Sequence, residues 1–352
     1  MEVDRPECAS WSPTVDVYIV INYTKILDID TLNQRFHAEA IIESKWFDPG
    51  IKTLNDTIDE KHIWKPDLYV ENGLIGKEYK EEIIYRIISE NIEIFVNQNE
   101  SVKETRFMIC EIRKVIGIFH ENLELENFPL DVQDLTIHVA TKKPGNIVKL
   151  ITMQEEKKIL KVSNTLDKSM WKMHHFLLTT KYLIIREYSF GVREYPSIKV
   201  SAKVFRQPGF FYWNAILPIL LVTLASLTPF VIDIKIPQTR LTSTCTLMLT
   251  SVGIRWTIGR LLPTVSYLTS LDKYSLASLF IIAVELFYHG IMGALYSKLP
   301  NKLAHLIDNG FFIFFCFIIF LKQLFFCLFI IRINIYRRKV TDGKVLQLNN
   351  ED

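Results

Sequence analysis

The stretch LTSTCTLMLTSVGIRWTI, residues 241–258, decides the fold class of this chain. It has the length of a membrane-spanning helix, yet it carries many hydroxyl side chains, which a helix facing lipid has little reason to carry. Steps of three and four residues align one helical face that is polar at one end, apolar in the middle and basic at the other end. This face holds Thr242, Thr246, Leu249, Gly253, Trp256 and Arg260. Two interpretations stay open, a helix that lines a pore and a buried helix whose hydroxyls bond to its own backbone.

Strongly apolar segments lie on both sides of this helix and are long enough to span a bilayer. The gaps between them are short, which favours a compact bundle of four membrane helices in residues 209–335, followed by a tail at 336–352. The predicted helices span residues 210–231, 239–260, 274–295 and 311–332. Four spans put both termini on the outer side, where the positive-inside rule disfavours the basic residues Arg337, Arg338 and Lys339.

Residues 1–208 are mixed in character and richly charged, as in a domain that folds in water. Short alternating runs rich in Val, Ile and Tyr recur between turn signals such as Asp48-Pro49-Gly50. They cover residues 15–27, 36–46, 92–96, 106–119, 135–140, 176–187 and 198–205. Their spacing predicts an antiparallel, immunoglobulin-like β-sandwich of about ten strands.

Bulk composition excludes several classes of function. The 41 Lys and Arg nearly balance the 39 Asp and Glu, so net charge does not favour a nucleic-acid partner. Neighbouring His174 and His175 would point to opposite faces of a strand, and no nucleophile or Gly-rich phosphate loop accompanies them, so we expect neither an enzyme nor a cofactor or metal centre.

Cys8 and Cys110 are the pair that could form a bridge within residues 1–208. The polar N-terminus carries no signal peptide, and we expect a processed or trimmed form of a longer chain.

Several short motifs, in this order around four spans, resemble the pentameric ligand-gated ion channel (Cys-loop receptor) superfamily. Ile63–Asp67 resembles its W-x-P-D signature, and Phe128–Asp131 resembles the F-P-x-D of its signature loop. Arg206–Tyr212 resembles the beginning of its first membrane helix. The resemblance implies an extracellular sandwich, a transmembrane four-helix bundle and assembly of five subunits.

The chain departs from the family in its signature loop. Glu121 and Leu135 stand where the flanking cysteines are expected, so the loop disulfide cannot form. In the chain-entropy picture this forgoes roughly 3 kcal/mol of stability. We expect packing of Phe128 and Pro129 to hold the loop instead.

The resemblance implies a ligand pocket between adjacent extracellular domains. Its residues would be Glu71, Lys142, Lys143, Tyr188 and Tyr195 on one subunit, and Ile41 and Phe107 on the next. Lys142 falls near an expected Trp, so the aromatic box that suits amines is depleted, and an anionic or amphiphilic small molecule fits better. The alternative is that the two tyrosines are ordinary strand aromatics without a ligand.

The resemblance implies that Asp131 and Arg206, near Phe128 and Pro129, lie where the family couples its two halves. A partly buried pair would transmit movement, whereas a surface pair would contribute under about 1 kcal/mol. Within the membrane half we predict that Arg255 pairs with Glu285, at similar depth, unless each faces water separately. Lys322 interrupts the last apolar segment, as a polar, lipid-facing or bundle-facing residue.

Charge near the predicted pore indicates its selectivity. Thr239 precedes Arg240 where cation channels of the family carry Glu, and Arg260 would place a ring of positive charge at the outer mouth. Both favour anions, with Leu249 as a hydrophobic gate. We expect a multi-pass, neurotransmitter-receptor-like subunit in the plasma membrane, with identical or related subunits, a small-molecule ligand and membrane lipid as partners. The alternatives are a cation channel and a non-conducting binding protein of the same fold.

Overall fold

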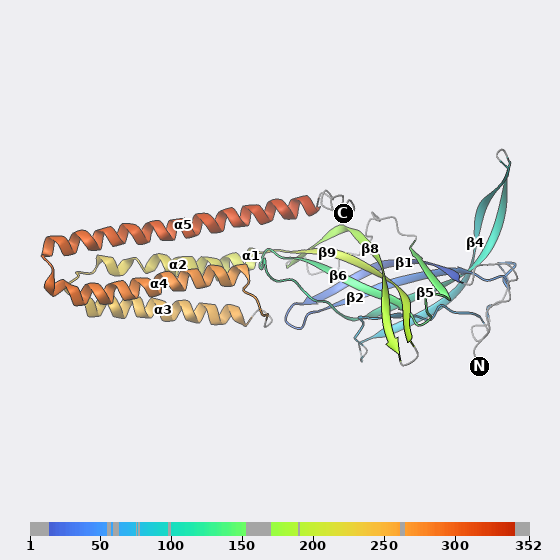
Figure 1. Cartoon of the computed structure of the whole chain (residues 1–352), viewed down its shortest axis with the longest axis horizontal. Coiled ribbons are helices and arrows are strands. Elements are labelled where there is room, and N and C mark those ends of the chain that lie inside the picture. The colour runs from blue at the N-terminus through green and yellow to red at the C-terminus, as the bar shows by residue number, and fades with distance from the viewer. Residues whose placement is uncertain are drawn as a thin grey trace.

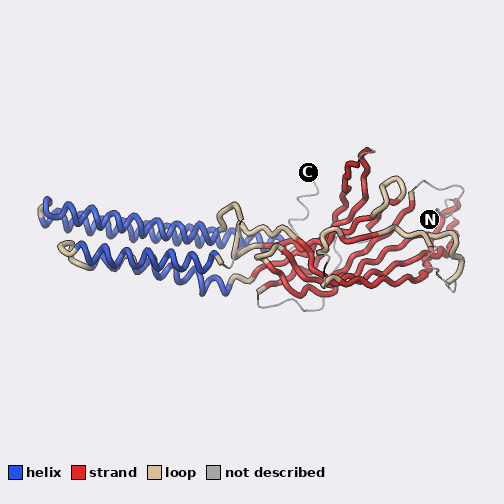
Figure 2. Tube along the Cα trace, turned by 90° about the horizontal axis from the view of Figure 1, so that it is seen from below, coloured by secondary structure: helices blue, strands red, loops and turns tan. Residues whose placement is uncertain are grey.

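The structure is a computed structural model of an elongated molecule, with strands at one end and helices at the other (Figures 1 and 2). The residues that it describes are 14–54, 58, 63–74, 76, 78–97, 100–152, 170–188, 191–260 and 265–341. The predicted order, a sheet-rich N-terminal domain followed by helices, is confirmed.

Two sheets form the N-terminal domain. The first has the order β4 (Lys80–Asn97), β5 (Glu100–His120), β2 (Arg35–Phe47), β1 (Val15–Asp30) and β7 (Val148–Thr152). The second has the order β3 (Leu68–Val70), β6 (Val132–Thr141), β9 (Gly191–Arg206) and β8 (Trp171–Tyr188). Neighbouring strands are antiparallel except β1 and β7.

The core lies between the sheets because every second residue of a strand points to the same face. In β2, buried and half-buried positions alternate, and Phe36 stacks on Phe119 at 5.3 Å between ring centroids. The Trp64 ring of the W-x-P-D motif packs edge-on against Trp46 at 6.1 Å. Cys110 is a buried free thiol, and Cys8 lies outside the described residues.

Four helical segments follow the sandwich. The first combines α1 (Gly209–Phe211), a π-helical turn (Tyr212–Ile216), α2 (Leu217–Ala225) and a 3-10 turn (Thr228–Val231). The others are α3 (Pro237–Gly259), α4 (Ser270–Leu295) and α5 (Asn301–Thr341). Local chemistry starts two of them: Pro237 occupies the first turn of α3, and Thr269 and Asp272 form a reciprocal capping box at α4.

Within the described residues, three helices are long and apolar enough to cross a membrane, namely Gly209–Val231, Ser270–Leu295 and Asn301–Lys339. The hydroxyl and basic side chains of α3 lower its hydropathy, and it is not among them. Helix α3 nevertheless packs alongside α4, and its 23 residues are nearly as many as the 26 of α4 (Figure 1).

The last helix is longer than predicted. The sequence predicts a linker before residue 311 and a helical end at 332, but α5 runs from Asn301 to Thr341. At 1.5 Å per residue it measures about 60 Å, roughly twice the hydrocarbon core of a bilayer. Hydropathy detects the lipid-facing part of a helix and misses polar turns that extend beyond it. Arg337, Arg338 and Lys339 therefore lie on a helical extension that reaches the sandwich (Figure 1).

Candidate functional site

A buried ion pair joins the end of the sandwich to the beginning of the helices. Arg206, the last residue of β9, donates from Nε to Asp131 Oδ1 at 2.7 Å and from Nη2 to Asp131 Oδ2 at 3.2 Å. The two residues are 3% and 2% exposed. Such a pair is costly to break from one side, because the remaining charge stays buried without its partner.

Aromatic rings surround the guanidinium of Arg206. Its central carbon lies 4.2 Å from the ring centroid of Trp171 and 5.0 Å from that of Phe128. Phe128 in turn packs edge-on against Phe211 of α1, with centroids 4.5 Å apart. The loop before β6 thus inserts an aromatic residue between the ion pair and the first helix.

Hydrogen bonds hold this loop without a disulfide. Gln133 bridges it, because its amide donates to the Glu124 carbonyl at 2.8 Å and accepts from the Glu124 N–H at 3.0 Å. The same amide donates to Asp131 at 2.7 Å. Glu121, at a missing cysteine position, accepts from the Thr136 N–H at 2.8 Å. The loop is thus held by these hydrogen bonds, which we call the polar clamp, in addition to the packing of Phe128. No sequence motif predicts the polar clamp.

Three further contacts tie the junction to the helices. The Leu125 N–H donates to the Tyr267 hydroxyl at 2.9 Å. Ser270, the first residue of α4, donates from its N–H to the Glu126 carbonyl at 2.9 Å. Arg337 on the extension of α5 donates to the Arg206 carbonyl at 2.7 Å. The junction therefore touches the first, third and fourth helical segments and the loop that follows α3.

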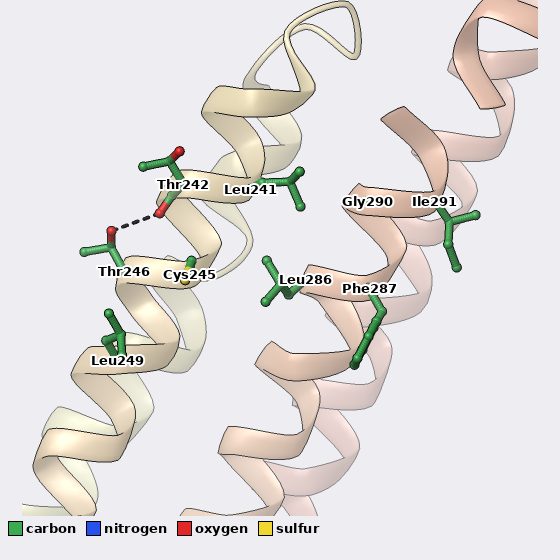
Figure 3. Close-up of a pocket in the computed structure, with 9 residues that line it drawn as sticks. All are labelled: Leu241, Thr242, Cys245, Thr246, Leu249, Leu286, Phe287, Gly290 and Ile291. Carbon is green, nitrogen blue, oxygen red and sulfur yellow. Dashed lines mark hydrogen bonds between the residues drawn. The ribbon is translucent and has the colours of Figure 1, made fainter. Parts of the chain in front are cut away.

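The face of α3 predicted to line a pore is exposed in the single chain. All its predicted positions are exposed, Leu249 at 67% and Trp256 at 66%, whereas Thr244, Ser251 and Ile258 on the other side are buried. The exposed hydroxyls also bond to their own backbone, as Thr246 does to the Thr242 carbonyl at 2.9 Å (Figure 3). Back-bonding and exposure thus occur together, and the stripe is left uncovered within the single chain.

A groove of about 650 Å³ lies between α3 and α4, next to this stripe. Thr242 and Thr246 come from α3, and Phe287 and Ile291 come from α4 (Figure 3). The close approach of the helices depends on Gly293, because a Cβ there would lie 2.5 Å from Pro237 Cβ.

Arg240 does not face the same side as the stripe. It is 2% exposed and donates to both oxygens of Asp308 on α5, at 2.8 and 2.9 Å. It also donates to the Ile232 carbonyl, and Tyr288 of α4 donates to Asp308 at 2.9 Å. This ion pair fixes the beginning of α3 to α4 and α5.

The predicted pair between Arg255 and Glu285 is wrong. Arg255 lies near the end of α3, whereas Glu285 lies fifteen residues after the beginning of α4. With antiparallel helices and 1.5 Å per residue, their depths differ by about 16 Å. Glu285 is fully buried, and Arg255 Nη1 has no hydrogen-bond partner within the described part of the chain, so the two side chains are not paired.

The predicted ligand residues divide between the two sheets. Glu71, Lys142, Lys143 and Tyr195 belong to or border the β3–β6–β9–β8 sheet, whereas Ile41 and Phe107 lie on β2 and β5. One chain does not bring the two sets together. The backbone of Tyr188 pairs with Gly191, and its side chain lies outside the description.

Two of these residues are already engaged within the chain. Tyr195 is 6% exposed, so its ring is not available at the surface. Lys143 lies 3.6 Å from the Asp67 carboxylate and 4.6 Å from the ring centroid of Trp64. By contrast, Lys142 and Glu71 are exposed.

A polar cluster on the same sheet was not predicted. Tyr182 of β8 donates to Glu71 at 2.8 Å and lies 3.4 Å from Nδ1 of His138 on β6. The ammonium of Lys199 on β9 lies 4.2 Å from the Tyr182 ring centroid. Burial first, and then the positive Lys199, lower the pKa of His138. No sequence motif joins these residues; sheet pairing brings them together.

No group of three His, Cys, Asp or Glu side chains that could hold a metal is found in the described ranges. Residues 2–208 match a family model described as neurotransmitter-gated ion-channel ligand binding domain. The match covers more than half of the chain and ends where the sandwich gives way to α1.

Proposed function

The chain belongs to the pentameric ligand-gated ion channel (Cys-loop) family, and on this premise we propose that it is one subunit of a channel whose pore is lined by α3. The family consists of membrane-embedded channels with an extracellular ligand-binding domain, a class distinct from enzymes. The pore, its gate and its selectivity are the proposal, and each rests on its own geometry.

The exposed polar stripe of α3 carries the proposal. A membrane-level helix that exposes threonines, glycine and arginine is unfavourable against lipid, but five copies around an axis would enclose those groups with water. The ring of Leu249 side chains would then be the apolar constriction. The groove beside α3 and α4 offers a surface for the neighbouring subunit.

The junction supports a gating route. A ligand between extracellular domains must bind the open state better than the closed state in order to open the pore. Movement of the sandwich would pass through Asp131 and Arg206 to α1, and through Glu126 and Ser270 to α4. The ion pair at the centre of this junction is buried and hydrogen-bonded, so it is suited to transmit a displacement rather than to slide.

Selectivity is proposed to favour anions. Arg260 is exposed at the end of α3, with its guanidinium 5.3 Å from the Trp256 ring centroid, and five such charges would repel cations at that mouth. Arg240 is paired with Asp308 and contributes no free charge to the stripe. The exposed Lys142 favours an anionic or amphiphilic ligand by the same electrostatic argument.

Currents from cells expressing this chain alone test the proposal. The Leu249→Ala channel is expected to leak without ligand, because smaller side chains leave a wider constriction that water fills more readily. Leu241→Ala on the same helix serves as the matched control. Reversal at the chloride potential supports anion selectivity, and reversal at a cation potential leaves the pore but overturns the selectivity.

A second candidate is a non-conducting binding protein of the same fold. It is favoured by the bulk of Trp256, whose ring would narrow the outer part of any pore. Absence of current from Leu249→Ala and from Trp256→Ala, with both variants at the cell surface as pentamers, would overturn the channel in its favour.

A further inference from the structure

Strands β4 and β5 continue as a two-stranded arm beyond the sheet to which they belong. Strand β2 pairs with β5 as far as Met108, opposite Phe47, whereas β4 and β5 stay paired along residues 89–97 and 100–107. Eight residues of strand measure about 26 Å. Figure 1 shows this arm, residues 89–97 and 100–107, projecting from the part of the sandwich that lies away from the helices. The proposed channel mechanism does not use it.

The arm has the properties of a segment that binds a partner. A two-stranded ribbon on its own is marginally stable in water, and its edges carry unpaired backbone groups. Within the described ranges β4 pairs with β5 alone, so β4 is an edge along its whole length. The arm holds four Glu against one Lys and one Arg, a net charge of −2, and the apolar run Ile94-Phe95-Val96. An acidic and apolar ribbon is complementary to a basic and apolar surface.

The edge of the second sheet has this complementary chemistry. In the part of the chain that the structure describes, β8 pairs with β9 alone and ends its sheet. The sequence of β8 holds three Lys and Arg against one Glu, a net charge of +2 with its histidines neutral. Leu183 is 56% exposed and Ile185 is 63% exposed on this strand. An edge strand of this kind can accept an added strand through its backbone groups.

A pocket of about 390 Å³ lies beside this edge, between β7, β8 and β9. Its lining includes apolar side chains, two lysines and one glutamate, namely Leu150, Leu183, Pro196, Lys149, Lys181 and Glu194. Its charged side chains therefore leave an excess of one positive charge. An aromatic side chain with a carboxylate close by in sequence fits such a pocket, and Phe95 of the arm lies two residues after Glu93.

We propose that the arm of one subunit docks on the β8 edge of the next copy of this chain, with Phe95 in the pocket beside that edge. Figure 1 shows the arm on one side of the sandwich and the end of the β8–β9 pair away from the helices on the opposite side. One chain therefore does not join the two surfaces, whereas a head-to-tail contact repeats from copy to copy until a ring closes. The inference rests on the proposed assembly of subunits and does not depend on conduction.

Cysteine cross-linking of the purified full chain tests this contact. Phe95→Cys and Leu183→Cys are combined in one chain, which is oxidised with copper phenanthroline and analysed on a non-reducing gel. We expect a ladder of products that ends at the pentamer, because each chain carries both partners of the contact. The matched control combines Phe95→Cys with Leu32→Cys, since Leu32 is 50% exposed but lies in the turn between β1 and β2. This control and each single variant should give the same pattern as the wild type.

Charge reversal tests the electrostatic part of the contact. In the double-cysteine chain, Glu104→Lys should slow cross-linking about fivefold, and adding Lys181→Glu should restore most of the rate. Carbodiimide coupling of the wild-type chain needs no variant, and we expect amide links between Lys181 and glutamates of the arm. Absence of these links from an intact wild-type pentamer overturns the proposal.

Native mass spectrometry before oxidation separates this inference from the proposed function. Pentamers that give no ladder overturn the arm contact and leave the channel proposal standing, whereas monomers alone overturn both. Covalent dimers from Phe95→Cys without Leu183→Cys would show that arms pair with arms, which also overturns the head-to-tail contact.

Discussion

At the residue scale, the hydrogen bonds of Gln133 hold the loop that has no disulfide. Gln133 makes hydrogen bonds to both backbone groups of Glu124 and to Asp131, and it is 2% exposed. Gln133→Ala should lower the free energy of unfolding by about 1–3 kcal/mol, because it leaves buried polar groups without partners. For a domain of this size that corresponds to a fall of several degrees, about 2–4 °C per kcal/mol, in the melting temperature.

Thermal unfolding of the purified chain, followed by size-exclusion chromatography after heating, measures this change. Gln238→Ala is the matched control, since Gln238 is an exposed glutamine whose backbone, not its side chain, is used by Thr242. Equal melting temperatures for Gln133→Ala and the wild type would contradict the clamp.

His138 gives the sandwich a pH dependence with a defined sign. Burial and Lys199 lower its pKa in the folded state, so below an unfolded pKa of about 6.5 the unfolded chain binds the proton more readily. Stability from this residue is therefore present above that pH and is lost as the pH falls through 6.5 toward the lower folded pKa. His138→Gln should flatten the melting temperature between about pH 7 and pH 5.

The exposed His120 provides the comparison for this prediction. His120→Gln should leave the acid-side loss of stability intact, measured by the same thermal assay across the pH series. A slope that persists in His138→Gln and disappears in His120→Gln would assign the effect to the wrong histidine and refute the argument.

At the scale of elements, the approach of α3 to α4 depends on one glycine. A Cβ at Gly293 would lie 2.5 Å from Pro237 Cβ, which no real contact tolerates, whereas a Cβ at Gly290 would lie 3.8 Å from Leu241. Gly293→Ala should displace the beginning of α3 and cost about 1–3 kcal/mol through overpacking. Gly290→Ala is the matched control, with an ordinary contact and a better helix former.

Yield of monodisperse protein and melting temperature together measure this effect. If Gly293→Ala matches Gly290→Ala in both, the two helices can separate without cost, and the base of α3 is less constrained than the structure indicates.

Several elements could be predicted from local pattern, and others could not. The alternation of apolar and polar residues in β1 and β2, with turn residues around them, indicates strands directly, because successive side chains of a strand point to opposite faces of the sheet. The length of α5 could not be found by hydropathy, since its ends leave the lipid. The ion pair between Arg240 and Asp308 could not be predicted either, because the two residues are 68 positions apart and no spacing rule joins them.

The candidate site divides in the same way. Asp131, Arg206 and the α3 stripe lie in motifs or in one helical period, and the sequence could identify them. Gln133, Tyr182 and Tyr267 act through pairing and packing between distant segments, which a single sequence does not reveal. The predicted pairing of Glu285 with Arg255 is wrong because a single sequence does not show where each helix begins and ends. Arg255 lies four residues before the end of α3, whereas Glu285 lies fifteen residues after the beginning of α4.

At the scale of the whole molecule, the two halves meet through a small buried junction rather than through a broad surface. The sandwich and the helices lie end to end, so their relative position depends on a few contacts (Figure 1). Asp131 and Arg206 are central among these, with Arg337 bonded to the Arg206 carbonyl from the far helix. Loss of this ion pair should therefore weaken the coupling between the stability of the sandwich and that of the helices.

A double-mutant cycle on this pair tests that cooperation. Asp131→Asn and Arg206→Met should each cost about 3–5 kcal/mol, and the double variant should cost less than their sum, because no buried charge is then left alone. The exposed pair between Lys203 and Asp134 on the neighbouring positions of β9 and β6 is the matched control, with an expected coupling under about 1 kcal/mol. Hydrogen exchange of residues 121–131 and of α1 should rise together in either single variant. If exchange rises in the loop but not in α1, the pair stabilises the sandwich alone, and the proposed route from ligand to pore must run through Glu126 and α4 instead.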